Sequence, residues 1–416
     1  MNMGREVLLR SLERQKRLLS ASVVLTPADS LPFSLVDRDR TAFLHGLYLT
    51  DKVRSRQAQM DAGIQFARRD GIARDIAAIH RLLADSLGAD EGTLRVLSGL
   101  HAHAATFLSI GTAGQTVLLL SEEGGGHAST RAILHRLGLR TVDFPLDYTR
   151  LCIDHAATRT LLRSLKPDFL FVDRSEGLKY EDLSFLGSID GPVKVFDASQ
   201  YLAPILTGRY TNPLLWGFDL LLFSLHKSFP GPQKAGIVAR TQGELWDRIV
   251  SGLNILVSSS HAENSYLVGL TLLRRDWLET YTQRMLETAA ELENELARRG
   301  LPIVSRNVQG EPDWPGTPHV WLRARSREEA FAYFERLGRT RIHTNYRKLP
   351  YNLGYGLRLG TTFSAVAGID NTDIESVGDV IQATINQGSS TSLRHRVRAI
   401  AESARSRAIV PPQYWT

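Results

Sequence analysis

The sequence predicts an α/β protein built on a mostly parallel sheet. Through the middle of the 416-residue chain, short apolar runs alternate with segments of helical periodicity, which is typical of strands covered by helices. The apolar runs lie at 116–121, 140–144, 168–173, 193–198, 219–225 and 235–240. Helical patterns, such as those over 103–111 and 157–165, separate them. We expect strands over these apolar runs, joined in one sheet.

The last third of the chain predicts a second, smaller α/β domain. An amphipathic helical pattern over about residues 267–299 ends at Gly300, a residue typical of helix C-termini. Strands are expected over 320–325 and 356–361, with a helix over 327–338 between them. The expected division is an N-terminal helical arm over 1–30, a large domain over 31–285, a small domain over 286–390 and a peripheral tail over 391–416.

The composition is that of an ordinary globular protein, 43% hydrophobic and 23% charged. Apolar runs of about 18 residues are absent, so we expect no membrane span. The single cysteine, Cys152, excludes an internal disulfide and suits a reducing cytosol. A net charge of +6 raises the question of nucleic acid, but the basic residues are dispersed and lack interleaved aromatics. We expect a cytoplasmic protein that binds neither nucleic acid nor membrane, and no metal site.

Two of the expected strands end in the side chains that pyridoxal phosphate (PLP) requires. The segment FSLHKSFPGPQKAG, residues 223–236, places Lys227 between a hydrophobic strand and a loop rich in Gly and Pro, and the strand VKVF ends at Asp197. Ligands collect at the carboxyl ends of such strands, where Ser224 also falls. A lysine amine forms a Schiff base with PLP, and a carboxylate holds the ring nitrogen protonated so that the ring accepts electrons. The sequence therefore predicts a PLP enzyme acting on an amino acid.

These segments resemble serine hydroxymethyltransferase, a PLP enzyme of fold type I. The likeness runs from about residue 20 to 370 and is densest over 193–236. There the lysine follows His226, a Gly231-Pro232 loop comes next, and Asp197 lies upstream, as in the family. The resemblance implies a mostly parallel seven-stranded sheet and a homodimer with active sites at the subunit interface.

The resemblance also implies roles for individual residues. Lys227 matches the Schiff-base lysine, Asp197 the partner of the pyridine nitrogen and His127 the histidine that stacks on the ring. The remaining cofactor contacts fall on Ser98, Gly99, Ser175, Gln200, Ser224 and His226. Arg358 matches the arginine that clamps the substrate carboxylate, for which a planar guanidinium is well suited, and Ser175 lies near the substrate.

Most of these residues have a structural alternative. Asp197 and Ser98 are also typical helix N-caps. His127 follows a glycine run and is otherwise a loop histidine, and Ser175 is otherwise a turn residue. The alternative for Arg358 is a salt bridge at a strand edge.

Departures from the family set the expected reaction. In LTDKVRSR, residues 49–56, Val53 and Ser55 stand where the family has the tyrosine and the glutamate that serve proton transfer and folate binding. Valine can neither transfer a proton nor form a hydrogen bond. Gln200 replaces the histidine of the family's Asp-x-x-His motif, and Leu100 replaces a phosphate-binding serine. We therefore expect no dependence on folate.

The expected enzyme is a PLP-dependent lyase or transferase of specialised metabolism that acts at Cα or Cβ of an L-amino acid through an aldimine and a quinonoid. Aldolase or transaldolase chemistry is the first expectation. The alternatives are β-elimination from a cysteine S-conjugate, decarboxylation coupled to oxidative deamination, and folate-dependent hydroxymethyl transfer. A PLP-fold binding protein without catalysis is a further alternative, against which Lys227, Asp197 and Arg358 argue together.

Overall fold

The computed structural model describes residues 4–49, 55–61, 66–306 and 313–416. Val53, at which the sequence departs from the hydroxymethyltransferase pattern, lies outside them. The chain divides into two compact units. Unit 1 comprises Met1–Val36, Glu176–Tyr180 and Asp276–Thr416, and unit 2 comprises Asp37–Ser175 and Glu181–Arg275. The division expected from sequence, with boundaries at 30, 285 and 390, remains a proposal.

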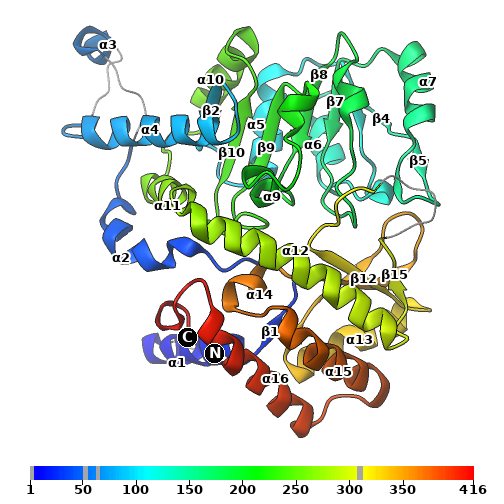
Figure 1. Cartoon of the computed structure of the whole chain (residues 1–416). Helices are drawn as coiled ribbons and strands as arrows, with labels where there is room; N and C mark the ends of the chain where they lie inside the picture. Colours follow the sequence, from blue (N-terminus) through cyan, green and yellow to red (C-terminus); the bar gives the residue numbers. More distant parts are fainter. Residues whose placement is uncertain (1–3, 50–54, 62–65, 307–312) are drawn as a thin grey trace. The chain divides into compact units, whose positions relative to one another are not determined.

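Unit 2 is built on a seven-stranded sheet with the strand order β2-β10-β9-β8-β7-β3-β4 (Figure 1). Its strands are β2 (Glu91–Thr93), β3 (Thr116–Leu119), β4 (Arg140–Asp143), β7 (Phe169–Val172), β8 (Val193–Asp197), β9 (Leu220–Ser224) and β10 (Ala235–Ala239). The strands from β4 to β9 in this order run parallel, whereas β10 is antiparallel to both its neighbours. The mostly parallel seven-stranded sheet is confirmed, and all six apolar runs form strands in it.

Helices on the sheet explain why its strands are so apolar. Every residue of β7, β9 and β10 is buried, as expected for strands of a sheet that is covered on both faces. Helix α5 (Gly99–Ile110) packs against β9, β10 and α10 (Glu244–Leu256). The other long helices of unit 2 are α4 (Asp70–Ser86), α6 (Thr130–Arg136), α7 (His155–Leu165) and α11 (Ala262–Leu272). The packing of α5 on β9 matters most, because it brings the first turn of that helix to the strand ends.

Unit 1 has a four-stranded antiparallel sheet of order β11-β12-β15-β14. The strands are β11 (Ile303–Val304), β12 (His319–Arg323), β14 (Asn345–Lys348) and β15 (Tyr355–Gly360). Helices α12 (Arg275–Arg298), α13 (Arg327–Thr340), α15 (Asn371–Gln387) and α16 (Thr391–Ala404) supply its core together with the sheet. Strand β1 (Val23–Val24) pairs with β13 (Ile342–His343), whereas helix α1 (Arg5–Ser20) has no buried residue.

Two expected elements differ in the structure. The single helix expected over 267–299 is two helices, because α11 ends at Leu272 and α12 begins at Arg275. The tail expected to be peripheral contains α16, which buries Leu393, Val397 and Ile400 in the core of unit 1. None of the helices in the described part of the chain is both long enough and apolar enough to cross a membrane.

Candidate active site

Polar residues gather where three neighbouring strands of unit 2 end. Strand β8 ends at Asp197 and β9 at Ser224, and Asp173 directly follows β7. These strands are parallel neighbours, so their carboxyl ends lie at one edge of the sheet. Lys227 comes three residues after β9, in the loop that leads to β10. The structure thus brings the predicted lysine loop and the predicted carboxylate to the same edge.

Asp197 is buried and hydrogen-bonded through both of its oxygens. Oδ2 lies 2.5 Å from Nε2 of His103, and Oδ1 accepts the backbone N–H of Ser199 at 2.7 Å. Burial alone would raise the pKa of this carboxyl, but the hydrogen bond and charge of His103, with the charge of Lys227, lower the pKa to about 2. Asp197 is therefore ionised at neutral pH, as a partner of a protonated ring nitrogen must be. It does not cap the next helix, α9 (Leu202–Leu206), which has Tyr201 at its N-cap.

His103 is a site residue that the sequence analysis missed. Its side chain, on α5, is 1% exposed, and Nδ1 lies 3.2 Å from the hydroxyl of Thr130. The ring stands edge-on to Phe171, at 5.0 Å between centroids, and to His127, at 6.0 Å. The available signal was a histidine between two alanines, Ala102 and Ala104, on a helix predicted to cover the sheet. What it touches becomes visible only once α5 is packed on the strand ends.

Asp173 is a second buried carboxyl, at the end of the neighbouring strand. Its Oδ2 accepts the backbone N–H of His127 at 3.3 Å, and its side chain also bonds Thr130. Oδ1 has no hydrogen-bond partner among the described residues. Burial raises the pKa of Asp173 well above its ordinary value; the bond with Thr130 opposes the rise, and the charge of Asp197 adds to it. The surroundings therefore favour the protonated form of Asp173, beside a carboxyl whose ionised form is favoured.

The glycine run before His127 is required by the backbone. A Cβ at Gly126 would lie 2.1 Å from the carbonyl oxygen of Leu120, and Gly125 has a left-handed φ of 86°. Gly125 also accepts the backbone N–H of Ser175 at 2.8 Å, so the two loops that carry His127 and Ser175 are joined. His127 is a loop histidine, as the alternative had it, but the loop holds it against His103.

Ser98 and Gly99 lie at the N-terminus of α5. The Ser98 hydroxyl accepts the backbone N–H of His101 at 3.2 Å, so the N-cap alternative is realised. A Cβ at Gly99 would come within 3.4 Å of the Ser224 Cβ and 3.6 Å of the Ser199 hydroxyl. The missing side chain leaves a small space between the helix end and β9. Backbone N–H groups at a helix N-terminus favour an anion such as the phosphate of PLP.

Three predicted cofactor contacts carry buried polar atoms that the described residues leave without a hydrogen bond: Gln200 Oε1, Ser224 Oγ and His226 Nδ1. Such atoms are rare in native proteins unless a ligand or water supplies the partner. Burial, and after it the charge of Lys227, lowers the pKa of His226, so this ring is neutral at pH 7. With the ionised Asp197 and the space at Gly99, these residues fit PLP.

Lys234 is a second residue that the sequence analysis missed. It is 1% exposed, and its ammonium donates to the carbonyl oxygen of Ser260 at 2.6 Å. After burial, its charge is the next cause that lowers the pKa of His101, in the first turn of α5, and of His261. A buried cation near the helix N-terminus adds to the attraction for an anion there. The hydroxyl of Ser260 is buried without a partner among the described residues.

Arg358 belongs to unit 1, on β15, and its side chain is buried. Its Nη1 lies 3.5 Å from Oε1 of Glu176, which also pairs with Arg347. Burial lowers the pKa of Arg358, whereas the charge of Glu176 raises it. The salt-bridge alternative is thus realised, and a carboxylate of the chain itself faces the predicted carboxylate clamp.

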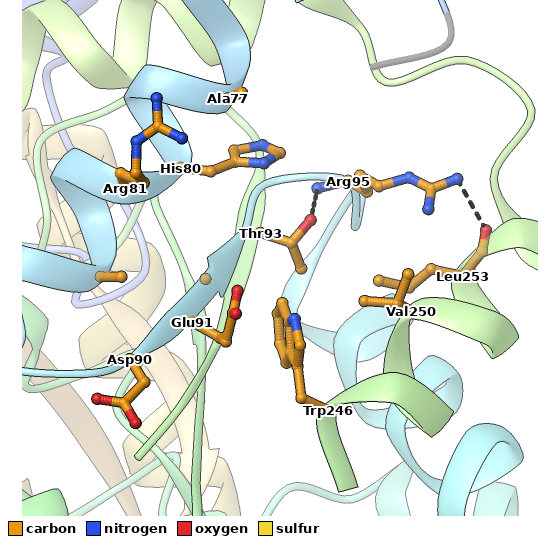
Figure 2. A pocket seen from close by; sticks show the side chains of 12 residues that line it. Ala77, His80, Arg81, Asp90, Glu91, Thr93, Arg95, Trp246, Val250 and Leu253 are labelled. Carbon is orange, nitrogen blue, oxygen red and sulfur yellow. Dashed lines mark hydrogen bonds between the residues drawn. The ribbon is translucent and has the colours of Figure 1, made fainter. Parts of the chain in front are cut away.

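A separate hollow of about 280 Å³ lies between α4, β2 and α10 in unit 2. Figure 2 shows Arg95 reaching across it toward α10, above Trp246. The Arg95 guanidinium donates to Asn254 Oδ1 at 2.9 Å and to the carbonyl oxygens of Leu253 and Val257 at 3.2 Å. None of the predicted site residues belongs to the described lining of this hollow, and we assign it no role in the reaction.

Comparison with known proteins supports the PLP assignment. The fold matches the crystal structure of L-threonine transaldolase from Pseudomonas fluorescens in the internal aldimine state, with a TM-score of 0.85 and 20% identity over 98% of this chain and 92% of that one. No family model matches the chain. The chain thus has the fold of this transaldolase and is similar to transaldolases and to serine hydroxymethyltransferase, which agrees with PLP at the strand-end site.

Among curated relatives, the chain is 31% identical over 302 residues to fluorothreonine transaldolase of Streptantibioticus cattleyicolor, covering 72% of this chain but only 46% of that protein. It is 28% identical over 335 residues to L-threonine:uridine-5'-aldehyde transaldolase of a Streptomyces species, covering 78% of each. It is also 24% identical over 324 residues to serine hydroxymethyltransferase of Pyrobaculum arsenaticum. The chain spans about half the length of the first of these relatives.

Proposed function

We propose that the chain is a folate-independent transaldolase acting on a β-hydroxy-L-amino acid, such as L-threonine, and an aldehyde. The similarity to L-threonine:uridine-5'-aldehyde transaldolase over 78% of both chains carries this proposal. In the reaction the Cα–Cβ bond of the amino acid breaks, the β-hydroxyl loses its proton, and acetaldehyde leaves when threonine is the donor. The glycine fragment's Cα then bonds the carbonyl carbon of the second aldehyde, whose oxygen takes up the proton. Atoms and charges balance without an oxidant.

PLP, when bound, supplies the electron sink for the pair left on Cα. In our proposal the Lys227 amine holds the cofactor and moves protons near Cα, and Asp197 keeps a proton on the ring nitrogen. His127 would stack on the bound ring. Ser98, Gly99 and Ser224 would hold the phosphate, and Ser175, Gln200 and His226 would supply the remaining contacts. These roles would give hydrogen-bond partners to the buried polar atoms of Gln200, Ser224 and His226, which have none among the described residues.

His103 acts in this proposal as a positioning residue. Its bond of 2.5 Å to Asp197 fixes the carboxylate that would pair with the ring nitrogen of bound PLP, and the Phe171 ring packs against the imidazole. Because Asp197 is buried, its ionised form depends on such a partner more than it would in water. His103 therefore sustains the charge on which electron withdrawal from Cα depends.

We assign binding of the substrate carboxylate to Arg358, and Ser175 is proposed as a further substrate contact. In the structure Glu176 pairs with this guanidinium, so the substrate carboxylate must displace or share that contact. A bidentate pair with the substrate is stronger than a single contact at 3.5 Å. The exchange would favour substrates that present a free α-carboxylate.

Independence from folate is proposed from the missing glutamate. Ser55 stands at its position, is exposed, and its hydroxyl accepts the backbone N–H of Ala58 at 3.2 Å. A hydroxyl at this position cannot replace a carboxylate in proton transfer at neutral pH. We also propose a cytoplasmic homodimer of specialised metabolism that binds small molecules and neither nucleic acid nor membrane. The exposed leucines of α1, including Leu8 and Leu12, support burial of that helix against a second copy.

The test is a product assay with PLP-loaded protein, L-threonine and a panel of aldehydes, with and without tetrahydrofolate. We expect acetaldehyde release and a new β-hydroxy amino acid whose mass is glycine plus the acceptor, at a rate that folate does not change. Lys227→Ala should abolish both products. Serine-to-glycine conversion that requires folate would contradict the proposal, as would release of pyruvate and ammonia or of carbon dioxide as the main products.

A further inference from the structure

Five arginines line one hollow of about 400 Å³ in unit 1. Arg14 and Arg17 come from α1, Arg341 from the turn after α13, and Arg398 and Arg405 from the end of the chain. The helices α1 and α16 that frame the hollow lie side by side in Figure 1. We call this hollow the arginine pocket.

The arginine pocket holds one carboxylate against five guanidinium groups. That carboxylate, Glu402, accepts the Nε–H of Arg398 at 2.7 Å. Arg405 donates from Nη2 to the carbonyl oxygen of Ser20 at 2.7 Å, while its Nε is buried without a partner among the described residues. The pocket therefore carries a formal charge of about +4 in a space smaller than about twice the Debye length, so these charges are not screened from one another.

Elsewhere in unit 1 some arginines pair with acids and others donate to backbone carbonyl oxygens, as Arg284 does to Ala365 and Arg336 to Ile385. Arg299 pairs with Glu295 and Asp379, and Arg407 pairs with Asp370 and Asp373. Single pairs join Arg306 to Glu293, Arg325 to Glu329 and Arg339 to Glu335. In the arginine pocket, by contrast, Arg14, Arg17, Arg341 and Arg405 have no carboxylate within ion-pair distance among the described residues. The arginine pocket differs from the rest of the unit in bringing five guanidinium groups to one hollow with a single carboxylate in its described lining.

We infer that the arginine pocket is a binding site for a small phosphorylated ligand, separate from the PLP site. Guanidinium groups bind phosphate oxygens in bidentate pairs, and several of them converge here with little internal competition. The volume falls in the range of about 300–1,000 Å³ that small-molecule sites occupy. The ligand would supply the missing negative charge and an acceptor for the buried Nε of Arg405. The transaldolase proposal is not needed for this site.

The same chemistry is also offered by a lipid headgroup, and α1 is amphipathic with exposed leucines. The pocket favours a soluble ligand, because three chain segments enclose it rather than one helix face. The experiment below separates these two sources.

In the test, inorganic pyrophosphate is titrated into the full PLP-loaded chain in a phosphate-free buffer. Isothermal titration calorimetry measures the binding. Saturable binding is expected. The double variant Arg14→Gln/Arg17→Gln should weaken it by about tenfold or more, because both side chains are exposed and can be neutralised without disturbing the core. The control is Arg325→Gln/Arg339→Gln, which removes the same charge from paired, exposed arginines of the same unit. This control should bind pyrophosphate as the unmodified chain does.

Absence of saturable binding would overturn the inference, as would an equal loss in the control variant. A second experiment with lipid vesicles distinguishes a soluble phosphorylated ligand from a lipid headgroup. Sedimentation with vesicles of phosphatidylcholine and phosphatidylglycerol, without pyrophosphate binding in solution, would show that the arginines serve a membrane surface instead and would also overturn it. Transaldolase turnover, measured alongside, should be unchanged in both double variants, so that failure of this site and failure of the proposed reaction are told apart.

Discussion

The ends of β7 and β8 offer the same residue type in nearly the same surroundings, yet the pKa of Asp173 is raised and that of Asp197 is lowered. Both side chains are buried, and both lie at the carboxyl ends of parallel neighbouring strands. They differ in their partners. Asp197 faces the ring nitrogen of His103 and the charge of Lys227, whereas Asp173 has a hydroxyl and a backbone N–H. Burial alone therefore does not set the ionisation of a carboxyl at this site; the cation beside it does.

Replacing the charged member of this pair should have the largest effect. Asp197→Asn keeps the shape but removes the charge that holds a proton on the cofactor ring. Turnover of L-threonine should fall by about 10²–10³-fold, the range typical of losing one preorganised electrostatic group. Release of acetaldehyde measures it, with the PLP content of the variant as the control. Turnover close to that of the unmodified enzyme would show that the charge at position 197 is not used.

Replacing His103, the partner of Asp197, should reduce turnover less than replacing Asp197 itself. Loss of a group that orients a site residue typically costs about 10–100-fold in metal sites, and we expect a similar loss for His103→Ala. His103→Asn, which can still donate to the carboxylate, should recover part of it. The readout that separates positioning from folding is the pH dependence of the visible PLP absorbance, which should shift in His103→Ala. An unshifted profile with equal losses in both variants would contradict a positioning role.

The two carboxyls should also affect stability with opposite signs of pH dependence. Asp197 has a lowered pKa, so its contribution is present above the unfolded pKa of about 3.9 and is lost as the pH falls toward about 2. Asp173 has a raised pKa, so its contribution is present below about pH 3.9 and is lost as the pH rises. Denaturant unfolding of Asp197→Asn and Asp173→Asn against the unmodified chain should give differences that change in opposite directions with pH. If both differences in unfolding free energy changed in the same direction with pH, the opposite pKa shifts of Asp173 and Asp197 would be contradicted.

The smallest effect on turnover is expected from Asp173→Asn. A neutral carboxyl and an amide have similar size and each supplies one acceptor oxygen, so the bonds from His127 and Thr130 can persist. We expect turnover within about threefold of the unmodified enzyme, since burial raises the pKa of Asp173 and favours its uncharged form. A loss as large as that of Asp197→Asn would mean that Asp173 is ionised after all.

The site residues that the sequence alone predicted are those that lie at the end of a strand or in the loop directly after it. Asp197 and Ser224 end their strands, and the loop that carries Lys227 follows, so periodicity and a local motif were sufficient to place them. His103 and Lys234 were missed because their role depends on which side chains α5 and the loop after β9 meet in three dimensions. The pairing of Arg358 with Glu176 was open for the same reason, since the two residues are far apart in sequence.

The fold followed the same pattern. The six apolar runs became strands because each is short, apolar and bounded by turn residues. The break between α11 and α12 was missed, because the amphipathic pattern continues across Leu273 and Arg274 although the helix does not. The tail appeared peripheral because its charged residues dominate its composition, whereas Leu393, Val397 and Ile400 recur at a spacing that buries one face of α16.

Borohydride reduction of the PLP-loaded enzyme, followed by peptide mass mapping, tests the central claim most directly. Reduction fixes the Schiff base as a stable secondary amine, and we predict the pyridoxyl mass on the peptide that contains Lys227. A label on another lysine, such as Lys234, or no label on a protein that retains its coenzyme, would contradict the site described at the ends of β8 and β9.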